Sequence, residues 1–391
     1  MFWKAVTGGL LLALSADLLG WGAEGQEDRR GKKEVSGGAT IYLGQDRAPW
    51  RPLIHTTVNL SDITSIKSTF QLRTFDPEGA MFYGDTKRGG DWFVLSLMDG
   101  VPVMQISRGG VQISVAGGPK LNDGEWHTLE VSNQGMFVLL EVDGSDQLVV
   151  GMQSQNSEEV RSGELRLALG GILIDNDRMM VQFDPKMDGC LRGGSWLNLS
   201  IPWESEVEEL QPCYQDVRPG GYFTGAGFAV FNASVLSLEG GRVVRAELQG
   251  DFSQMDGTVL SIRTPGEQLT LALVTNNHTK EVTLTLGKDK LSLKAFRRLL
   301  IMFQTDSLQL VPDDDESKIN TLAIGPMSRP GYLTMWTEGR LAIGGLLGEG
   351  EDSVGSQFLT GCLEKIQVQG RDLDLDLAVK HKSISSHSCP A

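Results

Sequence analysis

The stretch from Phe75 to Gly100 combines carboxylates with apolar residues, and no other part of the chain is as chemically informative. Asp76 and Glu78 lie two residues apart, and Asp91 comes directly before two aromatic residues. In an extended backbone, residues i and i+2 point to the same side, so Asp76 and Glu78 are placed to bind one cation together. Carboxylates beside an apolar β surface suit either a hard cation or an apolar ligand with polar ends.

The elements that position these residues are predicted to be strands. The same stretch contains two apolar segments joined by a polar turn, and apolar residues alternate with other residues over 138–142, 269–273 and 282–286. The 48 glycines and 14 prolines make the chain rich in turns. Many short alternating segments with regular turn signals predict an all-β sandwich or barrel.

The two halves of the chain resemble each other. Gly163–Ile174 matches Glu338–Glu349, and each match is followed by Gly-Cys-Leu, at 189–191 and 361–363. A repeat of about 170 residues indicates a duplicated domain, because solenoid repeats are much shorter. The predicted domains are residues 41–216 and 217–391.

The N-terminus has the pattern of a secretory signal peptide. Lys4 precedes an apolar run from Val6 to Ala16, and small residues follow at 20–25. A membrane anchor is the alternative, but Asp17 ends the run before the roughly 20 residues that span a bilayer. We therefore predict a signal peptide over 1–23, a flexible polar leader over 24–40, and secretion.

The four cysteines fit the oxidising environment of a secreted protein. Four cysteines allow three pairings, and local closure favours Cys190–Cys213 with Cys362–Cys389, because shorter loops lose less chain entropy. A zinc site is the alternative, but the chain contains no Cys-x-x-Cys spacing. Candidate glycosylation sequons begin at Asn59, Asn198, Asn232 and Asn277.

Charge and missing motifs exclude several functions. The net charge of −15 argues against nucleic acid and anionic membranes as partners. The chain has only five histidines, with no nucleophile elbow, His-Glu-x-x-His motif, P-loop or dinucleotide fingerprint. We predict that the protein is not an enzyme.

Three motifs carry a family resemblance: FDPEGAMFYGDTKRGGDWFVLSLMDG (75–100), LNDGEWHTLEV (121–131) and LLEVDG (139–144). Together they resemble the laminin G-like domain family, over nearly all of the chain from about residue 40 to Cys389. The resemblance implies two jelly-roll-like antiparallel β-sandwiches in tandem.

Within this family, the motifs are most similar to members that bind a steroid between the sheets of the first domain. The resemblance implies that Ser68 hydrogen-bonds the oxygen of the steroid A ring. It assigns Asp91 to the hydroxyl at the other end, and Phe93 and Val131 to the walls. Without the resemblance, Ser68 could be an ordinary turn hydroxyl and Asp91 a surface charge at a strand end. Phe93 and Val131 could be ordinary core residues of the sandwich.

Three residues of the implied steroid site depart from the family pattern. Arg108 stands in place of an asparagine that assists the hydroxyl contact. Asn133 and Leu165 stand at two methionine positions, so Asn133 brings an amide that needs a hydrogen-bond partner. These departures affect the expected affinity and steroid preference.

The resemblance also implies a structural calcium site. Asp76 and Glu78 match carboxylate ligands of the family, and the backbone carbonyl of Lys186 completes the set. Solvated acids at a loop edge are the alternative. Gly109 and, approximately, Ser162 stand where the family has zinc-binding histidines, so we predict no zinc site.

Two functional hypotheses follow. The first is a secreted plasma carrier of androgens and estrogens, homodimeric through strands of its first domain. The alternative is a laminin G-like interaction protein that binds a receptor or extracellular-matrix ligand with calcium and has no steroid site. An apolar space between the first-domain sheets favours the carrier, whereas a calcium-dependent basic patch favours the alternative.

Overall fold

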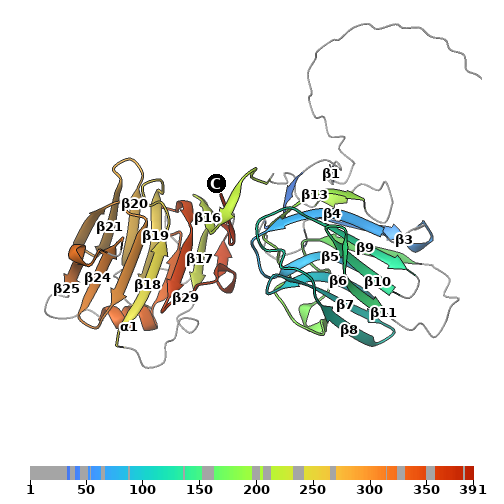
Figure 1. Ribbon diagram of the computed structural model, residues 1–391. Coiled ribbons are helices and arrows are strands. Elements are labelled where there is room, and N and C mark those ends of the chain that lie inside the picture. The colour runs from blue at the N-terminus through green and yellow to red at the C-terminus, as the bar shows by residue number, and fades with distance from the viewer. Residues whose placement is uncertain are drawn as a thin grey trace, which may run out of the picture.

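The computed structural model describes residues 33–35, 40–44, 52, 54–62, 67–86, 89–134, 137–151, 163–195, 203–205, 213–231, 242–264, 270–313, 315–323, 331–348, 357–381 and 384–391. In this part of the chain, no helix has the length and apolar character needed to cross a membrane. The described residues form two β-sandwiches that lie side by side (Figure 1).

The first sandwich consists of a sheet of eight strands and a sheet of six. The larger sheet runs, in spatial order, β1 (Lys33–Val35), β14 (Trp203–Ser205), β3 (Ile54–Asn59), β12 (Glu164–Leu169), β5 (Gly79–Thr86), β6 (Asp91–Met98), β7 (Val101–Arg108) and β8 (Val111–Ala116). The smaller sheet runs β11 (Ser145–Gly151), β10 (Phe137–Val142), β9 (His127–Gln134), β4 (Lys67–Thr74), β13 (Gly189–Ser195) and β2 (Ile41–Tyr42). All neighbouring strands pair antiparallel.

The second sandwich has sheets of seven and six strands. The larger runs β22 (Asp289–Lys294), β21 (Glu281–Leu286), β20 (Thr270–Asn276), β19 (Gly257–Arg263), β26 (Arg340–Ile343), β17 (Phe228–Phe231) and β30 (Val379–His381). The smaller runs β25 (Asn320–Ala323), β24 (Ser307–Pro312), β23 (Arg298–Phe303), β18 (Val244–Gln249), β28 (Lys365–Val368) and β29 (Arg371–Asp372). A small sheet of three strands contains β27 (Thr360–Leu363), β16 (Gly221–Thr224) and β31 (Ile384–Ser385). A second small sheet pairs β15 (Val217–Pro219) with β32 (Ser388–Pro390). The helical elements are α1 (Tyr332–Glu338) and the short turns η1 (Leu60–Asp62), η2 (Asn176–Arg178), η4 (Glu316–Lys318) and η5 (Leu375–Leu377).

The two sandwiches share one strand order. In the first, β12 lies between β3 and β5; in the second, β26 lies between β17 and β19. These two strands carry the two matching sequence segments. Likewise β9 lies between β10 and β4, as β23 lies between β24 and β18. The internal resemblance therefore corresponds to equivalent strands of a repeated fold.

Alternation places the core between the sheets. In β4 the inward side chains of Phe70 and Leu72 are buried, while the outward ones between them are partly exposed. The rings of Phe70 and Phe82 contact edge to face with centroids 6.2 Å apart, and Phe82 contacts Phe93 at 5.9 Å. Because Phe70 lies on the smaller sheet and the other two on the larger, this aromatic row crosses the space between the sheets.

Helix α1 fills one end of the second sandwich. Its side chains Tyr332, Met335 and Trp336 are buried, and the Trp336 ring lies 4.7 Å from that of Phe303. The first amide groups of the helix donate to the carbonyls of Thr305 and Gln304, which satisfies donors that a helix N-terminus leaves unpaired. The helix packs against β19 of one sheet and β23 of the other, so it closes the space between them.

Both predicted disulfides are confirmed. Cys190 pairs with Cys213, with Cα atoms 6.0 Å apart, and Cys362 pairs with Cys389 at 5.9 Å. Each bond closes a short loop late in its half of the chain, as the local-closure argument predicted.

His127 ties two turns of the first sandwich together. Its Nδ1 lies 2.8 Å from Asp143 Oδ2, and its Nε2 lies 3.1 Å from Asp123 Oδ1. Burial lowers the pKa of His127, but the hydrogen bonds to Asp143 and Asp123 outweigh it and raise the pKa above its ordinary value of 6.5. The charged imidazole therefore stabilises the fold.

We expect His127→Gln to remove this stabilisation, by about 0.2–1 kcal/mol for a partly exposed ion pair. A folded-state pKa above the unfolded value gives stability that is complete below about pH 6.5 and is lost as the pH rises through the folded pKa. Urea unfolding between pH 5 and 9 should show a difference between the two proteins that is largest at acid pH. A difference that stays constant over this range would contradict the prediction.

Candidate functional site

Both sheets contribute predicted steroid residues to the interior of the first sandwich. Ser68 is on β4, on the same side as the core residue Phe70, and only 1% of its surface is exposed. It pairs across the ladder with Val131 of β9, which is also buried. The structure thus places a buried hydroxyl beside an apolar wall residue on the inner face of the smaller sheet.

The facing sheet supplies Phe93 and Leu165. Phe93 is on β6, on the same side as the buried Leu95, and Leu165 is on β12, on the same side as Leu167. Both are only partly buried although they pack against the core. Other side chains with this behaviour are Leu60, Ile113, Val115 and Val138. These apolar side chains pack against the core and are only partly covered by the rest of the protein.

Asp91 and Arg108 lie at the same end of the larger sheet. Asp91 begins β6 two residues before Phe93, and Arg108 ends β7 two residues after the inward Ile106. One oxygen of Asp91, Oδ1, accepts a hydrogen bond from the amide of Gly109 at 2.9 Å. Asp91 is therefore oriented by the turn after β7.

Several predicted residues lie outside the described residues or only partly within them. Asn133 is in β9, on the inward register of Val131, but its side chain is not described. Asn198, Asn232, Ser162 and the whole 1–32 segment are also outside.

Two sequons are described. Asn59 is exposed at the end of β3. Asn277 is partly buried, its amide donates to Asp256 Oδ1, and its side-chain oxygen is buried without a hydrogen-bond partner.

The predicted calcium ligands converge where β5 begins. Asp76 is 2% exposed, and its carboxylate accepts from the amides of Glu78 at 3.0 Å and Asp188 at 2.8 Å. Glu78 accepts from the amide of Asp184 at 3.0 Å. Gly79 has φ +153°, and a Cβ there would lie 2.5 Å from the Lys186 carbonyl oxygen. Only glycine permits this approach, so the carbonyl lies against the backbone beside Glu78.

The second sandwich contributes two residues that sequence reasoning missed. His387 Nε2 lies 2.6 Å from Asp376 Oδ2 and 3.5 Å from Asp76 Oδ1. Asp76, Asp376 and His387 each offer a ligand atom, and these atoms lie within 4.8 Å of one another. The separation of about 300 residues leaves no local signal of this contact.

Electrostatics favour a positive charge beside Asp76. Burial raises the pKa of Asp76 to about 8, although the charge of His387 and the two amides lower it. Burial lowers the pKa of His387, but its hydrogen bond to Asp376 and the charge of Asp76 raise it to about 9. Carboxylate and carbonyl oxygens are donors that calcium prefers, so the set fits a hard cation.

A separate surface pocket of about 640 Å³ lies on the outer face of the first sandwich. Thr57, Arg166 and Asn176 are among its lining residues. It includes none of the residues predicted to contact steroid or calcium.

The fold places the protein among tandem laminin G-like proteins. A model of the laminin G domain matches residues 72–201. The mouse laminin α1 chain, domains LG4-5, superposes with a TM-score of 0.64, covering 92% of this chain and 95% of that structure at 17% identity.

The curated relatives indicate which family of laminin G-like proteins this chain belongs to. Sex hormone-binding globulin of Homo sapiens is 34% identical over 345 residues, which cover 87% of this chain and 84% of the relative. The protein of the same name from Oryctolagus cuniculus is 32% identical over 356 residues, covering 89% and 86%. The chain belongs to the sex hormone-binding globulin family.

Proposed function

We propose that this protein is a secreted plasma carrier that binds sex steroids between the sheets of its first sandwich. The observation that carries the proposal is the buried Ser68 hydroxyl on an inward position, facing an apolar core with partly covered side chains. An apolar space with one or two fixed polar groups is the usual form of a small-molecule site. The names of the relatives, which state sex hormone binding, support the same ligand class.

The proposal assigns a role to each residue. Ser68 donates to the steroid A-ring oxygen, and Asp91 accepts from the hydroxyl at the other end. Phe93, Val131 and Leu165 form apolar walls. Arg108 stands near Asp91, Asn133 stands at a pocket-lining position, and both influence the steroid preference. The domain limits 41–216 and 217–391, the signal peptide over 1–23 and the leader over 24–40 are part of the same proposal.

The filled end of the second sandwich argues against a second steroid site there. Helix α1 lies in the chain between β25 and β26. Buried aromatic side chains of α1 occupy the space between the second pair of sheets. An equivalent steroid position in the second sandwich is therefore taken by protein.

The test is a titration of the signal-cleaved protein with tritiated dihydrotestosterone and estradiol in calcium buffer. Saturable nanomolar binding is the expected result. Absence of binding up to micromolar steroid, by protein with a β-rich circular dichroism spectrum, would overturn the carrier. The interaction-protein alternative, with a receptor or matrix ligand, would then lead.

The proposal includes a structural calcium ion held by Asp76, Glu78 and the Lys186 carbonyl, with Asp376 close by from the second sandwich. It includes no zinc ion at Gly109 and Ser162. The calcium ion would fix the loop before β5 and add to the positive charge that His387 already places beside Asp76. With few protein oxygens, water completes the coordination, so modest affinity is expected.

We expect calcium to raise the thermal stability of the protein, and Asp76→Asn to abolish most of the increase. A ligand at 100 times its Kd stabilises by about 2.7 kcal/mol. Differential scanning calorimetry with calcium and with chelator measures the difference. The exposed Asp62→Asn serves as the control and should keep the response; an unchanged response in Asp76→Asn would contradict the assignment.

The homodimer is also a proposal. Strand β8 is an edge of the eight-stranded sheet, and Val111 on it is 58% exposed. An open edge can pair with the same edge of a second copy. Sedimentation equilibrium would show the dimer.

A further inference from the structure

We propose that residues Ile384–Pro390, here named the C-terminal clamp, fix the second sandwich to the first, and that the Cys362–Cys389 disulfide keeps the clamp in place. The inference does not depend on whether a steroid binds. Figure 1 shows the C-terminus on the side of the second sandwich that faces the first.

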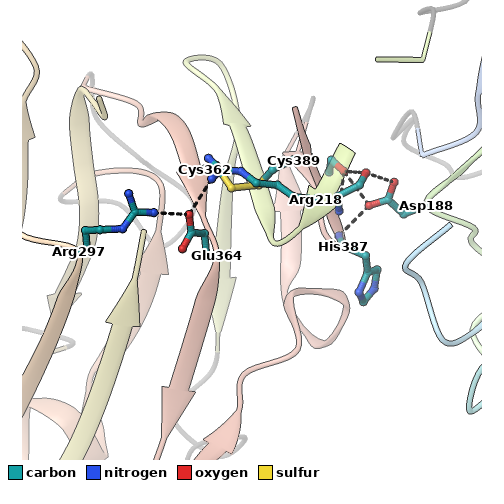
Figure 2. The surroundings of a disulfide bond; sticks show 9 residues. Asp188, Arg218, Arg297, Cys362, Glu364, His387 and Cys389 are labelled. Carbon is teal, nitrogen blue, oxygen red and sulfur yellow. Dashed lines mark hydrogen bonds and ion pairs between the residues drawn. A yellow bond between two sulfur atoms is a disulfide. The ribbon is translucent and has the colours of Figure 1, made fainter. Parts of the chain in front are cut away.

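The anchor of the clamp is a buried carboxylate of the first sandwich. Asp188 directly precedes β13 and is 7% exposed. Its Oδ2 accepts from the Ser385 hydroxyl at 2.8 Å and from the His387 amide at 2.8 Å, and its Oδ1 lies 3.4 Å from the Ser388 hydroxyl. All three donors come from the clamp, as Figure 2 shows for Asp188 and His387.

These contacts are expected to be strong. Hydrogen bonds to an ionised acceptor are stronger than neutral ones, and a buried carboxylate that loses its donors keeps the whole desolvation penalty. Separation of the sandwiches would replace these three donors with water. The joined arrangement is favoured because the clamp holds its donors in position, whereas bridging water molecules would have to be ordered.

The clamp itself has little secondary structure to hold it on the second sandwich. Strand β31 has two residues and β32 has three, and strands this short are weak on their own. The disulfide ties Cys389, which is completely buried, to Cys362 of β27. The covalent bond therefore adds to the noncovalent restraints on Ser388 and His387, which are the pairing of β32 with β15, the hydrogen bond from the Gly220 amide to the His387 carbonyl and the contact of His387 with Asp376.

Ion pairs hold the partner strand of β32 beside the disulfide. Arg218 of β15 lies 2.8 Å from Glu364, and Arg297 lies 3.1 Å from the same carboxylate oxygen (Figure 2). The ladder pairs Arg218 with Cys389. The clamp is therefore fixed to the second sandwich on one side and to Asp188 on the other.

The other connection between the sandwiches is the linker after Cys213. Arg73 of the first sandwich donates to the carbonyls of Tyr214 and Gln215 and lies over the Trp126 ring at 4.8 Å. This attachment involves the chain before β15 and none of the clamp residues. Loss of the clamp would leave the linker as the hinge between two folded sandwiches.

The test compares Asp188→Ala and Cys362→Ala/Cys389→Ala with the parent protein by small-angle X-ray scattering. Both variants are expected to have a larger radius of gyration and a broader distance distribution. Endoproteinase Asp-N cleavage of the linker before Asp216 should become on the order of tenfold faster, because local opening exposes the linker. Asp62→Ala, an exposed acid of the first sandwich, should match the parent.

Asp188→Ala keeps the disulfide and lies outside the second sandwich, so it separates clamping from damage to that sandwich. Circular dichroism should retain the β signal in this variant. Scattering curves of Asp188→Ala that superpose on the parent would overturn the proposal, whatever the cysteine variant does. An open Asp188→Ala with a closed cysteine variant would overturn the role of the disulfide alone.

Discussion

Replacing Ser68 with alanine is expected to weaken steroid binding by about tenfold, equivalent to about 1.4 kcal/mol. The change removes one hydroxyl and almost no volume. A steroid oxygen that has left water would then lack its donor, and an unpaired buried polar group costs about 1–3 kcal/mol. The measurement is an equilibrium titration with tritiated dihydrotestosterone.

Ser132→Ala is the matched control for this experiment. Ser132 is next to Val131 on β9, is 8% exposed, and points to the opposite side of the strand. It should leave the affinity unchanged. Equal affinities of Ser68→Ala and the parent, with saturable binding in both, would place the steroid away from Ser68.

Replacing Arg166 with leucine is expected to destabilise the first sandwich by about 1–3 kcal/mol, because the buried carboxylate of Asp85 loses a charged donor, although the Arg166 side chain itself is 29% exposed. Arg166 Nε lies 2.7 Å from Asp85 Oδ1, and Nη2 contacts the other carboxylate oxygen. Asp85 is 1% exposed and also accepts from the Tyr83 hydroxyl at 2.8 Å. Without Arg166, the Tyr83 hydroxyl is the side-chain donor to this carboxylate that remains among the described residues.

Urea unfolding monitored by tryptophan fluorescence measures the loss. Lys67→Ala is the comparison, because Lys67 pairs with Glu130 at the surface and should cost less than about 1 kcal/mol. The double variant Arg166→Leu/Asp85→Leu should recover part of the stability, since replacing both partners removes the buried charge. A cost for Arg166→Leu no larger than for Lys67→Ala would mean that water reaches Asp85.

The sequence was most informative where the physical signal is local. Alternation in strands such as β21 depends on neighbouring residues, and β21 buries Val282, Leu284 and Leu286 as their period indicates. Loop closure likewise depends only on sequence separation, so both disulfide pairings could be predicted. Asp76 and Glu78 accept hydrogen bonds from the amides of Asp188 and Asp184, whereas calcium binding by the pair with the Lys186 carbonyl stays a prediction.

Contacts between the halves could not be predicted in the same way. Asp188 and Ser385 are 197 residues apart, and no sequence pattern around either residue indicates contact with the other. His387 reads in sequence as part of a polar tail, yet it reaches Asp76 and Asp376. Helix α1 was not predicted from the sequence. Its seven residues make too few turns for a periodic hydrophobic pattern, and its buried side chains are determined by tertiary contacts.

Helix α1 also determines how much ligand the proposed carrier can transport. Duplication of a carrier domain would by itself double the capacity of the chain. Here Tyr332, Met335 and Trp336 occupy the second copy of the interior. Under the proposed function, the expected stoichiometry is one steroid for each chain and two for a dimer, so the duplication doubled the protein mass carried with each hormone molecule.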